Sequence, residues 1–192
     1  MVAVSVRFLT TPMSDESVRY YEPKVFITEA DIHARVKELA EKINSEYGNQ
    51  ELTVICLLKG SILFFNDLLK HLKMPVLCEF LGLSSYGSHA QSSGEVKVTL
   101  DLGEPLLGKH VLIVEDIVDT GLTLSYTLDY LQMRKPSSLK IATLLFKPDA
   151  LKVKSLKLDY VGFEIPNRFV VGYGLDYAEK FRGLPYIGVI ET

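Results

Sequence analysis

Residues 111–123 read Val-Leu-Ile-Val-Glu-Asp-Ile-Val-Asp-Thr-Gly-Leu-Thr, an apolar run that ends abruptly in acidic and hydroxyl side chains. Four apolar residues in succession are typical of a central parallel strand that is covered on both faces. The small and hydroxyl residues from Thr120 onward predict the start of a helix, whose free N–H groups bind anions. The stretch therefore predicts the ligand-binding edge of an open α/β sheet, with Glu115, Asp116 and Asp119 at the carboxyl end of the strand.

The acidic turn also has a simpler explanation, because Asp116 or Asp119 could cap the helix that begins near Gly121. Residue types alone leave the choice between a cap and a ligand site open. Three acids within five residues favour the site. Capping needs one carboxylate, and the others repel each other unless a cation or hydrogen-bond donors lie between them.

Composition indicates an ordinary globular protein of 192 residues, with 23% charged and 47% hydrophobic residues. The net charge of -3 argues against a general nucleic-acid binder, which needs a basic surface. Cys56 and Cys78 have apolar neighbours, so we predict two buried free thiols rather than a disulfide or a zinc site. The sequence has no recognisable secretory signal or membrane span, which predicts a cytoplasmic protein without a membrane partner.

Along the chain, apolar runs alternate with segments of helical periodicity. Beyond the strand that begins at Val111, the expected strands are 52–58, 75–83, 95–100 and 138–146, and the expected helices are 27–47, 62 to about 72, and 122–133. This alternation predicts an α/β fold with a mostly parallel, twisted, Rossmann-like sheet flanked by helices. Short pieces broken by Gly and Pro follow Pro148 and indicate a small lobe. We expect one domain, with a core of about 25–147 and 183–192 and a lobe of about 1–24 and 148–182.

The segment from Val111 to Gly121 resembles the phosphoribosyl pyrophosphate (PRPP) signature of the type I phosphoribosyltransferases, in the form typical of their 6-oxopurine branch. Leu57 to Ser61 resembles the family's pyrophosphate loop, Ser85-Tyr86-Gly87 its mobile loop, and Val161 to Arg182 its purine-binding hood. The resemblance implies a magnesium-dependent purine salvage enzyme. Such an enzyme transfers 5-phosphoribose from PRPP to N9 of hypoxanthine and guanine, giving IMP or GMP and pyrophosphate.

Within the PRPP signature, the resemblance implies that Glu115 and Asp116 hold the ribose hydroxyls and magnesium, and that Asp119 accepts the purine proton. It implies that the 5′-phosphate lies in a cradle formed by Thr120, Gly121, Leu122 and Thr123. Leu122 stands where some family members carry a basic residue, so we expect backbone N–H groups to bind the phosphate there.

Lys59 and Gly60 follow an apolar strand and precede a helix. Lys59 alone would be read as an exposed loop residue, and the Walker A spacing is absent. The resemblance implies that the Lys59-Gly60 backbone and the Arg182 guanidinium bind pyrophosphate. Asp176 and Arg182 alone could form a helix-surface ion pair of little energy. The resemblance instead assigns Asp176 to magnesium and to the exocyclic edge of the purine.

The expected purine-binding residues are Lys147, Phe169, Val170 and Asp176. Without the resemblance, Lys147 would be a solvated lysine and Phe169 a core residue. With it, the Lys147 ammonium donates to the 6-oxo group, Phe169 stacks on the base, and the Val170 backbone reads the base edge. The resemblance also implies a lid at Ser85 and Tyr86 that excludes water.

Two other classes of protein remain open at this point. A non-catalytic PRPP-sensing regulator could keep residues 111–123, although Lys59-Gly60, Asp176 and Arg182 argue against it. A phosphoribosyltransferase for adenine or a pyrimidine would differ in the hood. The family usually assembles as homodimers or homotetramers, and we expect the same here.

Overall fold

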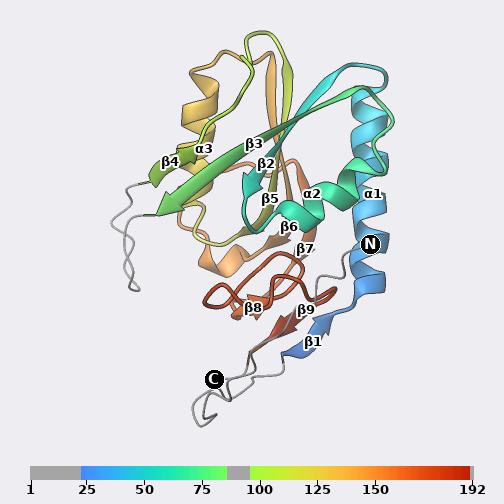
Figure 1. Ribbon diagram of the computed structural model, residues 1–192, viewed down its shortest axis with the longest axis vertical. Helices are drawn as coiled ribbons and strands as arrows, with labels where there is room; N and C mark the ends of the chain where they lie inside the picture. Colours follow the sequence, from blue (N-terminus) through green and yellow to red (C-terminus); the bar gives the residue numbers. More distant parts are fainter. Residues whose placement is uncertain (1–22, 86–95, 191–192) are drawn as a thin grey trace, which may run out of the picture.

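The large sheet has six strands, and five of them are parallel (Figure 1). The computed structural model describes residues 23–85 and 96–190. In spatial order the strands are β4 (Val96–Leu100), β3 (Val76–Ser85), β2 (Leu52–Leu58), β5 (His110–Val118), β6 (Ser138–Phe146) and β7 (Tyr160–Glu164). Only β4, at one edge, runs antiparallel to its neighbour. The predicted mostly parallel α/β sheet is confirmed.

β5 lies inside this sheet and is buried on both faces, as its apolar run predicted. The helices are α1 (Glu29–Tyr47), α2 (Ile62–Leu69) and α3 (Leu122–Gln132), with a short 3-10 helix, η1 (Pro148–Ala150). Leu112 and Val114 belong to the apolar cluster that includes α1 and α2, whereas Val111 and Ile113 pack in the cluster that includes α3. α3 therefore covers the face of the sheet opposite to α1 and α2.

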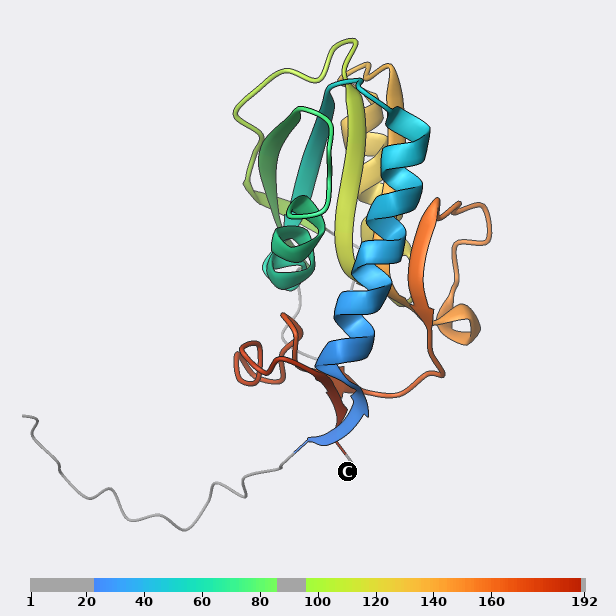
Figure 2. The same cartoon turned by 90° about the vertical axis from the view of Figure 1, so that its right-hand side faces the viewer.

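α1 connects the small sheet described below to the large one. It begins after Thr28, whose hydroxyl accepts a hydrogen bond from the Asp31 N–H, a standard arrangement at a helix start. Its buried residues recur at helical spacing and belong to the apolar core. Figure 2 shows α1 running along the large sheet. α2 is shorter than predicted, because it ends at Leu69 and not near 72.

A separate antiparallel sheet contains β1 (Lys24–Ile27), β9 (Ile187–Val189) and β8 (Val170–Val171), with β9 in the middle. The expected division into core and lobe differs from the two sheets at three places. Residues 25–27 were expected in the core, but β1 pairs with β9 in the small sheet. The segment 160–164 was expected in the lobe but pairs with β6, and 187–189 was expected in the core but pairs with β1 and β8. A short extended segment does not reveal which of two sheets it joins.

The two cysteines differ. Cys56 is buried in β2, as predicted, but Cys78 in β3 is exposed, which corrects the prediction of two buried thiols. Its strand neighbours Leu77 and Phe80 are exposed as well, so an apolar sequence context did not imply burial on this strand. None of the described helices is long and apolar enough to cross a membrane.

Candidate active site

Three loops follow β2, β5 and β6, which are adjacent strands of the parallel sheet (Figure 1). Lys59-Gly60-Ser61 connects β2 to α2, residues 119–121 connect β5 to α3, and Lys147 follows β6 directly. Because carboxyl ends of parallel strands meet at one edge, the three loops lie side by side. This is the edge at which open α/β sheets bind ligands.

The pairing of β5 locates Glu115 and Asp116 more closely than the sequence did. We expected both carboxylates at the carboxyl end of the strand, where the apolar run stops at Val114. β5 instead stays paired with β6 as far as Val118, whereas its pairing with β2 ends at Val114. The two carboxylates therefore lie in the strand itself, where the neighbouring β2 no longer covers its edge.

One cavity of about 250 Å³ lies at this open edge. It brings together the residues assigned to pyrophosphate with three carboxylates from two distant parts of the chain. Its lining residues are Leu57, Leu58, Lys59, Gly60, Leu83, Glu115, Asp116, Thr123, Asp176 and Arg182.

A second cavity, of about 190 Å³, is lined by residues 115–121 together with Thr123 and Leu124. It contains most of the residues assigned to the 5′-phosphate and the ribose, including Asp119. It shares Glu115, Asp116 and Thr123 with the first cavity. Leu122 lines neither cavity, and its side chain is exposed.

The alternative that an acidic side chain caps α3 is wrong. The cap position is Gly121, which has a left-handed backbone (φ 78°), and no side chain makes a cap hydrogen bond there. Asp116 instead accepts a hydrogen bond from the Ile117 N–H at 2.8 Å. The backbone N–H groups at the start of α3 thus face the second cavity, and no carboxylate among the described residues accepts a hydrogen bond from them.

Burial at the open edge makes both adjacent carboxyl groups harder to ionise. It raises the pKa of Glu115 well above its usual range, and the neighbouring Asp116 raises it further. Burial also raises the pKa of Asp116 to about 6, although the Ile117 N–H and the Arg182 guanidinium oppose this shift. A bound cation would favour the ionised form of both groups.

Two glycines allow the walls of the first cavity to meet. A Cβ atom on Gly60 would lie 1.6 Å from a carboxylate oxygen of Asp116. A Cβ atom on Gly174, whose backbone is left-handed (φ 99°), would lie 1.9 Å from the carbonyl oxygen of Gly60. The peptide bond between Leu58 and Lys59 is cis. Both glycine positions therefore exclude any larger residue.

The two cations of the first cavity are paired with carboxylates. Arg182 contacts Asp176 at 2.7 Å, and Lys59 contacts Glu179 at 3.1 Å. Glu179 also lies 3.6 Å from Arg182. The Asp176–Arg182 pair is not the helix-surface pair that their spacing allowed, because no helix covers residues 176–182.

Lys147 is 7% exposed, so the interpretation as a solvated lysine is wrong. Its ammonium nitrogen lies 3.1 Å from a carboxylate oxygen of Asp119. The residue assigned to the 6-oxo group and the residue assigned to the purine proton therefore contact each other directly.

The other expected purine contacts are less closely grouped. Phe169 is 50% exposed and meets Tyr177 edge to face at 5.5 Å, so it is not a core residue. Val170 is buried in β8, and neither residue lines the two cavities. Of the expected lid, Ser85 ends β3 and Tyr86 lies outside the described residues.

Residues 28–178 match the family model described as the phosphoribosyl transferase domain. The chain belongs to the phosphoribosyltransferase family. The predicted family is thereby confirmed from a match that covers most of the sequence.

Named phosphoribosyltransferases are also its close relatives. The chain is 49% identical, over 88% of its length and 93% of the relative, to a hypoxanthine-guanine phosphoribosyltransferase of Bacillus subtilis. It is 47% identical, over 87% of its length and 85% of the relative, to the enzyme of that name from Mycobacterium bovis. The crystal structure of a hypoxanthine-guanine phosphoribosyltransferase from Bacillus anthracis superposes with a TM-score of 0.84 at 45% identity, over 88% of this chain and all of the other.

The expected magnesium can be tested against the donor set of this phosphoribosyltransferase. Glu115, Asp116 and Asp176 line one cavity, but Asp176 is already paired with Arg182. Among the described residues, no three His, Cys, Asp or Glu side chains are grouped closely enough to hold a metal alone. Mg²⁺ in proteins is often held by one or two carboxylates and by substrate phosphates. The donor set therefore fits a magnesium ion that binds together with a diphosphate substrate.

Sequence reasoning missed the position of Glu179 and the packing role of Gly174. Glu179 is one acid within a charged segment, and nothing in that pattern identifies Lys59, 120 residues away, as its partner. The signal for Gly174 was present but weak, since glycine on both sides of Tyr173 is typical of a backbone with left-handed residues.

Substitution of Gly60 tests this geometry. Gly60→Ala should lower phosphoribosyl transfer by about 10²-fold, because the new methyl group displaces the Asp116 carboxylate by an ångström or more. Steady-state kinetics checks the rate, and thermal unfolding checks that the protein still folds. Gly103→Ala, where a Cβ atom would meet only the end of Glu79 at 3.8 Å, is the control and should keep normal activity. A normal rate for Gly60→Ala would contradict the described cavity.

Proposed function

We propose that this protein transfers 5-phosphoribose from PRPP to N9 of hypoxanthine and guanine and releases pyrophosphate. The observation that carries the proposal is the pair of adjoining cavities that share Glu115 and Asp116. One contains the cations Lys59 and Arg182, and the other contains the start of α3. A ribose between them would have its diphosphate on one side and its 5′-phosphate on the other. The names of the relatives support the choice of base.

In this proposal, departure of pyrophosphate is assisted by the first cavity. Lys59 and Arg182 exchange their carboxylate partners for phosphate oxygens, and the planar guanidinium suits two oxygens at once. Magnesium, when bound, supplies positive charge that offsets the developing charge of the leaving group. Glu115 and Asp116 hold the ribose hydroxyls, and their negative charge stabilises a ribose ring that becomes positively charged.

The purine is handled by the contact between Lys147 and Asp119. The Lys147 ammonium donates to the 6-oxo oxygen, and a 6-amino purine offers no acceptor in that position. The Asp119 carboxylate accepts the proton from the base. Lys147 also fixes the orientation of that carboxylate at 3.1 Å before the base arrives. Phe169, exposed beside the site, stacks on the purine.

The remaining parts of the proposal concern the context of the reaction. We propose that Ser85 and Tyr86 belong to a lid and that the protein works in the cytoplasm. We also propose that each subunit is a single domain and that the subunits assemble as a homodimer or homotetramer. The grouping of Lys59, Asp176 and Arg182 in the cavity argues for catalysis and against a PRPP-sensing regulator.

A substrate panel tests the reaction. Purified protein with PRPP and Mg²⁺ should form IMP from hypoxanthine and GMP from guanine, measured by the change in ultraviolet absorbance. Removal of Mg²⁺ by a chelator should abolish the activity. Absence of turnover with hypoxanthine, guanine and xanthine would disprove the proposal, and turnover with adenine alone would indicate an adenine enzyme.

The role of Asp119 gives a second prediction. Asp119→Asn should reduce kcat by about 10²- to 10⁴-fold, the usual contribution of a general base. PRPP affinity, measured by calorimetry, should stay within a few-fold, because the phosphate and pyrophosphate contacts remain. Asp149→Asn, which changes a nearby exposed carboxylate, is the control. A near-normal kcat would remove Asp119 from the role of proton acceptor.

The role of Lys147 gives a third prediction. Lys147→Gln keeps a long side chain but removes the charge, so the preference for hypoxanthine over adenine in kcat/KM should fall at least about tenfold. Lys154→Gln, an exposed lysine seven residues later, should leave the preference unchanged. If Lys147→Gln discriminates as well as the unmodified protein, Lys147 does not read the 6-oxo group.

A further inference from the structure

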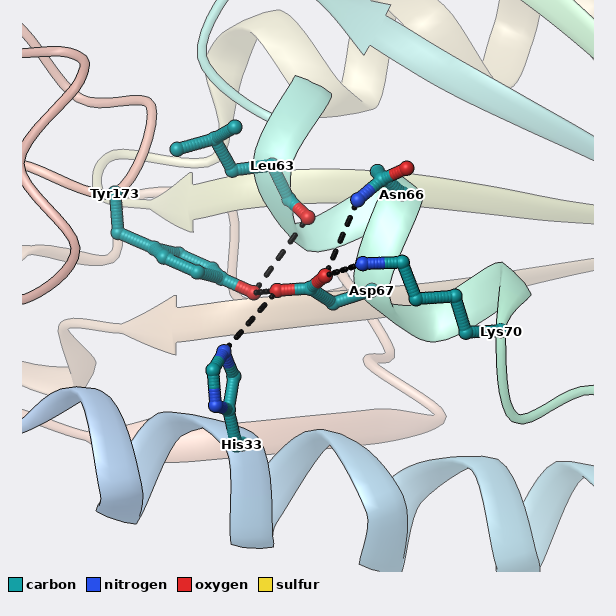
Figure 3. A network of polar contacts seen from close by, with 6 residues as sticks. All are labelled: His33, Leu63, Asn66, Asp67, Lys70 and Tyr173. Atoms are coloured by element: carbon teal, nitrogen blue, oxygen red, sulfur yellow. Dashed lines mark hydrogen bonds and ion pairs between the residues drawn. The ribbon is translucent and has the colours of Figure 1, made fainter.

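A polar contact outside the two cavities joins the segment before Asp176 to α2 (Figure 3). Tyr173 is 3% exposed, and its hydroxyl donates a hydrogen bond of 2.7 Å to Asp67. Asp67 lies on α2 and also contacts the Lys70 ammonium at 2.7 Å and a ring nitrogen of His33 at 3.5 Å. None of these four residues lines either cavity of the proposed site.

The chemistry of this contact makes it a strong one. Burial raises the pKa of Tyr173, and the hydrogen bond to Asp67 raises it further, so the phenol stays protonated and donates. Burial of Asp67 opposes ionisation, but hydrogen bonds from Lys70 and Tyr173 outweigh it and lower the pKa of this carboxyl. The bond therefore joins a neutral donor to an ionised acceptor, which is stronger than a bond between two neutral groups.

The backbone around Tyr173 needs such an anchor. Gly172, Tyr173 and Gly174 are all left-handed, with φ of 94°, 48° and 99°. This conformation is costly for tyrosine and persists only where surrounding contacts hold it. The backbone hydrogen bonds of this turn run from the N–H of Tyr173 to Leu184 at 2.8 Å and from the N–H of Gly174 to Arg182 at 2.9 Å. Gly172 and Leu175 also exchange two, at 3.0 and 3.1 Å.

The turn at Tyr173 lies directly before Asp176 and contacts Arg182, the two residues that form one wall of the first cavity. The Gly174 backbone packs on the Gly60 carbonyl, and the Gly174 carbonyl accepts a hydrogen bond of 2.8 Å from the Arg182 guanidinium. The other wall is the Lys59-Gly60 loop, which continues through Ser61 into α2. The hydrogen bond between the Tyr173 hydroxyl and the Asp67 carboxylate therefore connects the two walls at a point outside the cavity.

We infer that Tyr173 and Asp67 are positioning residues, which hold Arg182 at the correct distance from the Lys59-Gly60 loop. The inference deepens the proposed function and rests on it, because pyrophosphate is taken as the ligand between these walls. The purine side of the hood has independent support, since β8 is paired with β9. Loss of the Tyr173–Asp67 bond should therefore weaken pyrophosphate recognition and leave purine recognition unchanged.

The test is Tyr173→Phe, which removes only the hydroxyl. We expect the Kd for pyrophosphate with Mg²⁺, measured by calorimetry, to rise about tenfold, as for loss of one hydrogen bond to a charged group. The KM for PRPP should rise by a similar factor, with the KM for hypoxanthine within twofold. Calorimetry does not require turnover. Weaker pyrophosphate binding in a protein that lacks turnover would therefore disprove the proposed reaction but support the positioning role.

Asp67 provides a second route to the same result. Asp67→Ala should weaken pyrophosphate binding at least as much as Tyr173→Phe. Asp67→Asn keeps an oxygen acceptor for the phenol and should be milder. If the two residues act through one bond, the double variant Tyr173→Phe/Asp67→Ala should bind pyrophosphate no more weakly than Asp67→Ala alone.

The matched control is Tyr160→Phe. Tyr160 is also buried, and its hydroxyl also donates to a carboxylate, that of Glu46, but it lies in β7 and lines neither cavity. This variant should lower the melting temperature without changing pyrophosphate binding. Unchanged pyrophosphate binding in Tyr173→Phe would overturn the inference. An equal rise in the Kd for pyrophosphate and the KM for hypoxanthine would also overturn it. So would the same rise in the pyrophosphate Kd of Tyr160→Phe.

Discussion

The site depends on unequal pairing along the two sides of β5. Hydrogen bonding to β2 ends at Val114, while hydrogen bonding to β6 continues to Val118. Residues 115–118 are therefore hydrogen-bonded to β6 on one side and have no described strand on the other. Glu115 and Asp116 line a cavity from this fixed strand. Side chains on a strand are held more firmly than those on a loop, which suits groups that must be placed to within a fraction of an ångström.

The second wall of the site comes from a segment more than 50 residues further along the chain. Gly174 packs against Gly60, and this close approach brings Arg182 and Asp176 to the acidic pair on β5. The small sheet supports this wall, because β8 precedes it and β9 follows it. The apolar cluster that contains α1 and α2 also includes Val170, Tyr173 and Ile187, so the two sheets share a core.

The sequence predicted the large sheet well because its information is local. The apolar run of β5 and the helical spacing of α1 each report burial directly, and both elements lie where they were expected. Pairing partners are not local. The segments 25–27, 160–164 and 187–189 were therefore grouped differently from the sheets that they join, and the exposed Cys78 was expected to be buried. The acidic pair was found by its pattern, whereas the contact of Glu179 with Lys59 required the fold.

Glu179 pairs with the two cations of the first cavity, Lys59 and Arg182. Lys59 and Arg182 already have carboxylate partners, so a ligand meets no unpaired cation in this pair. An entering anion thus exchanges one set of ion pairs for another and gains only the difference between them. The Lys59–Glu179 pair is exposed and therefore weak, so a diphosphate that contacts both cations can displace it, whereas a singly charged anion gains little. In the proposed function, the carboxylates from Asp176 to Glu179 consequently compete with the diphosphate for the same two cations.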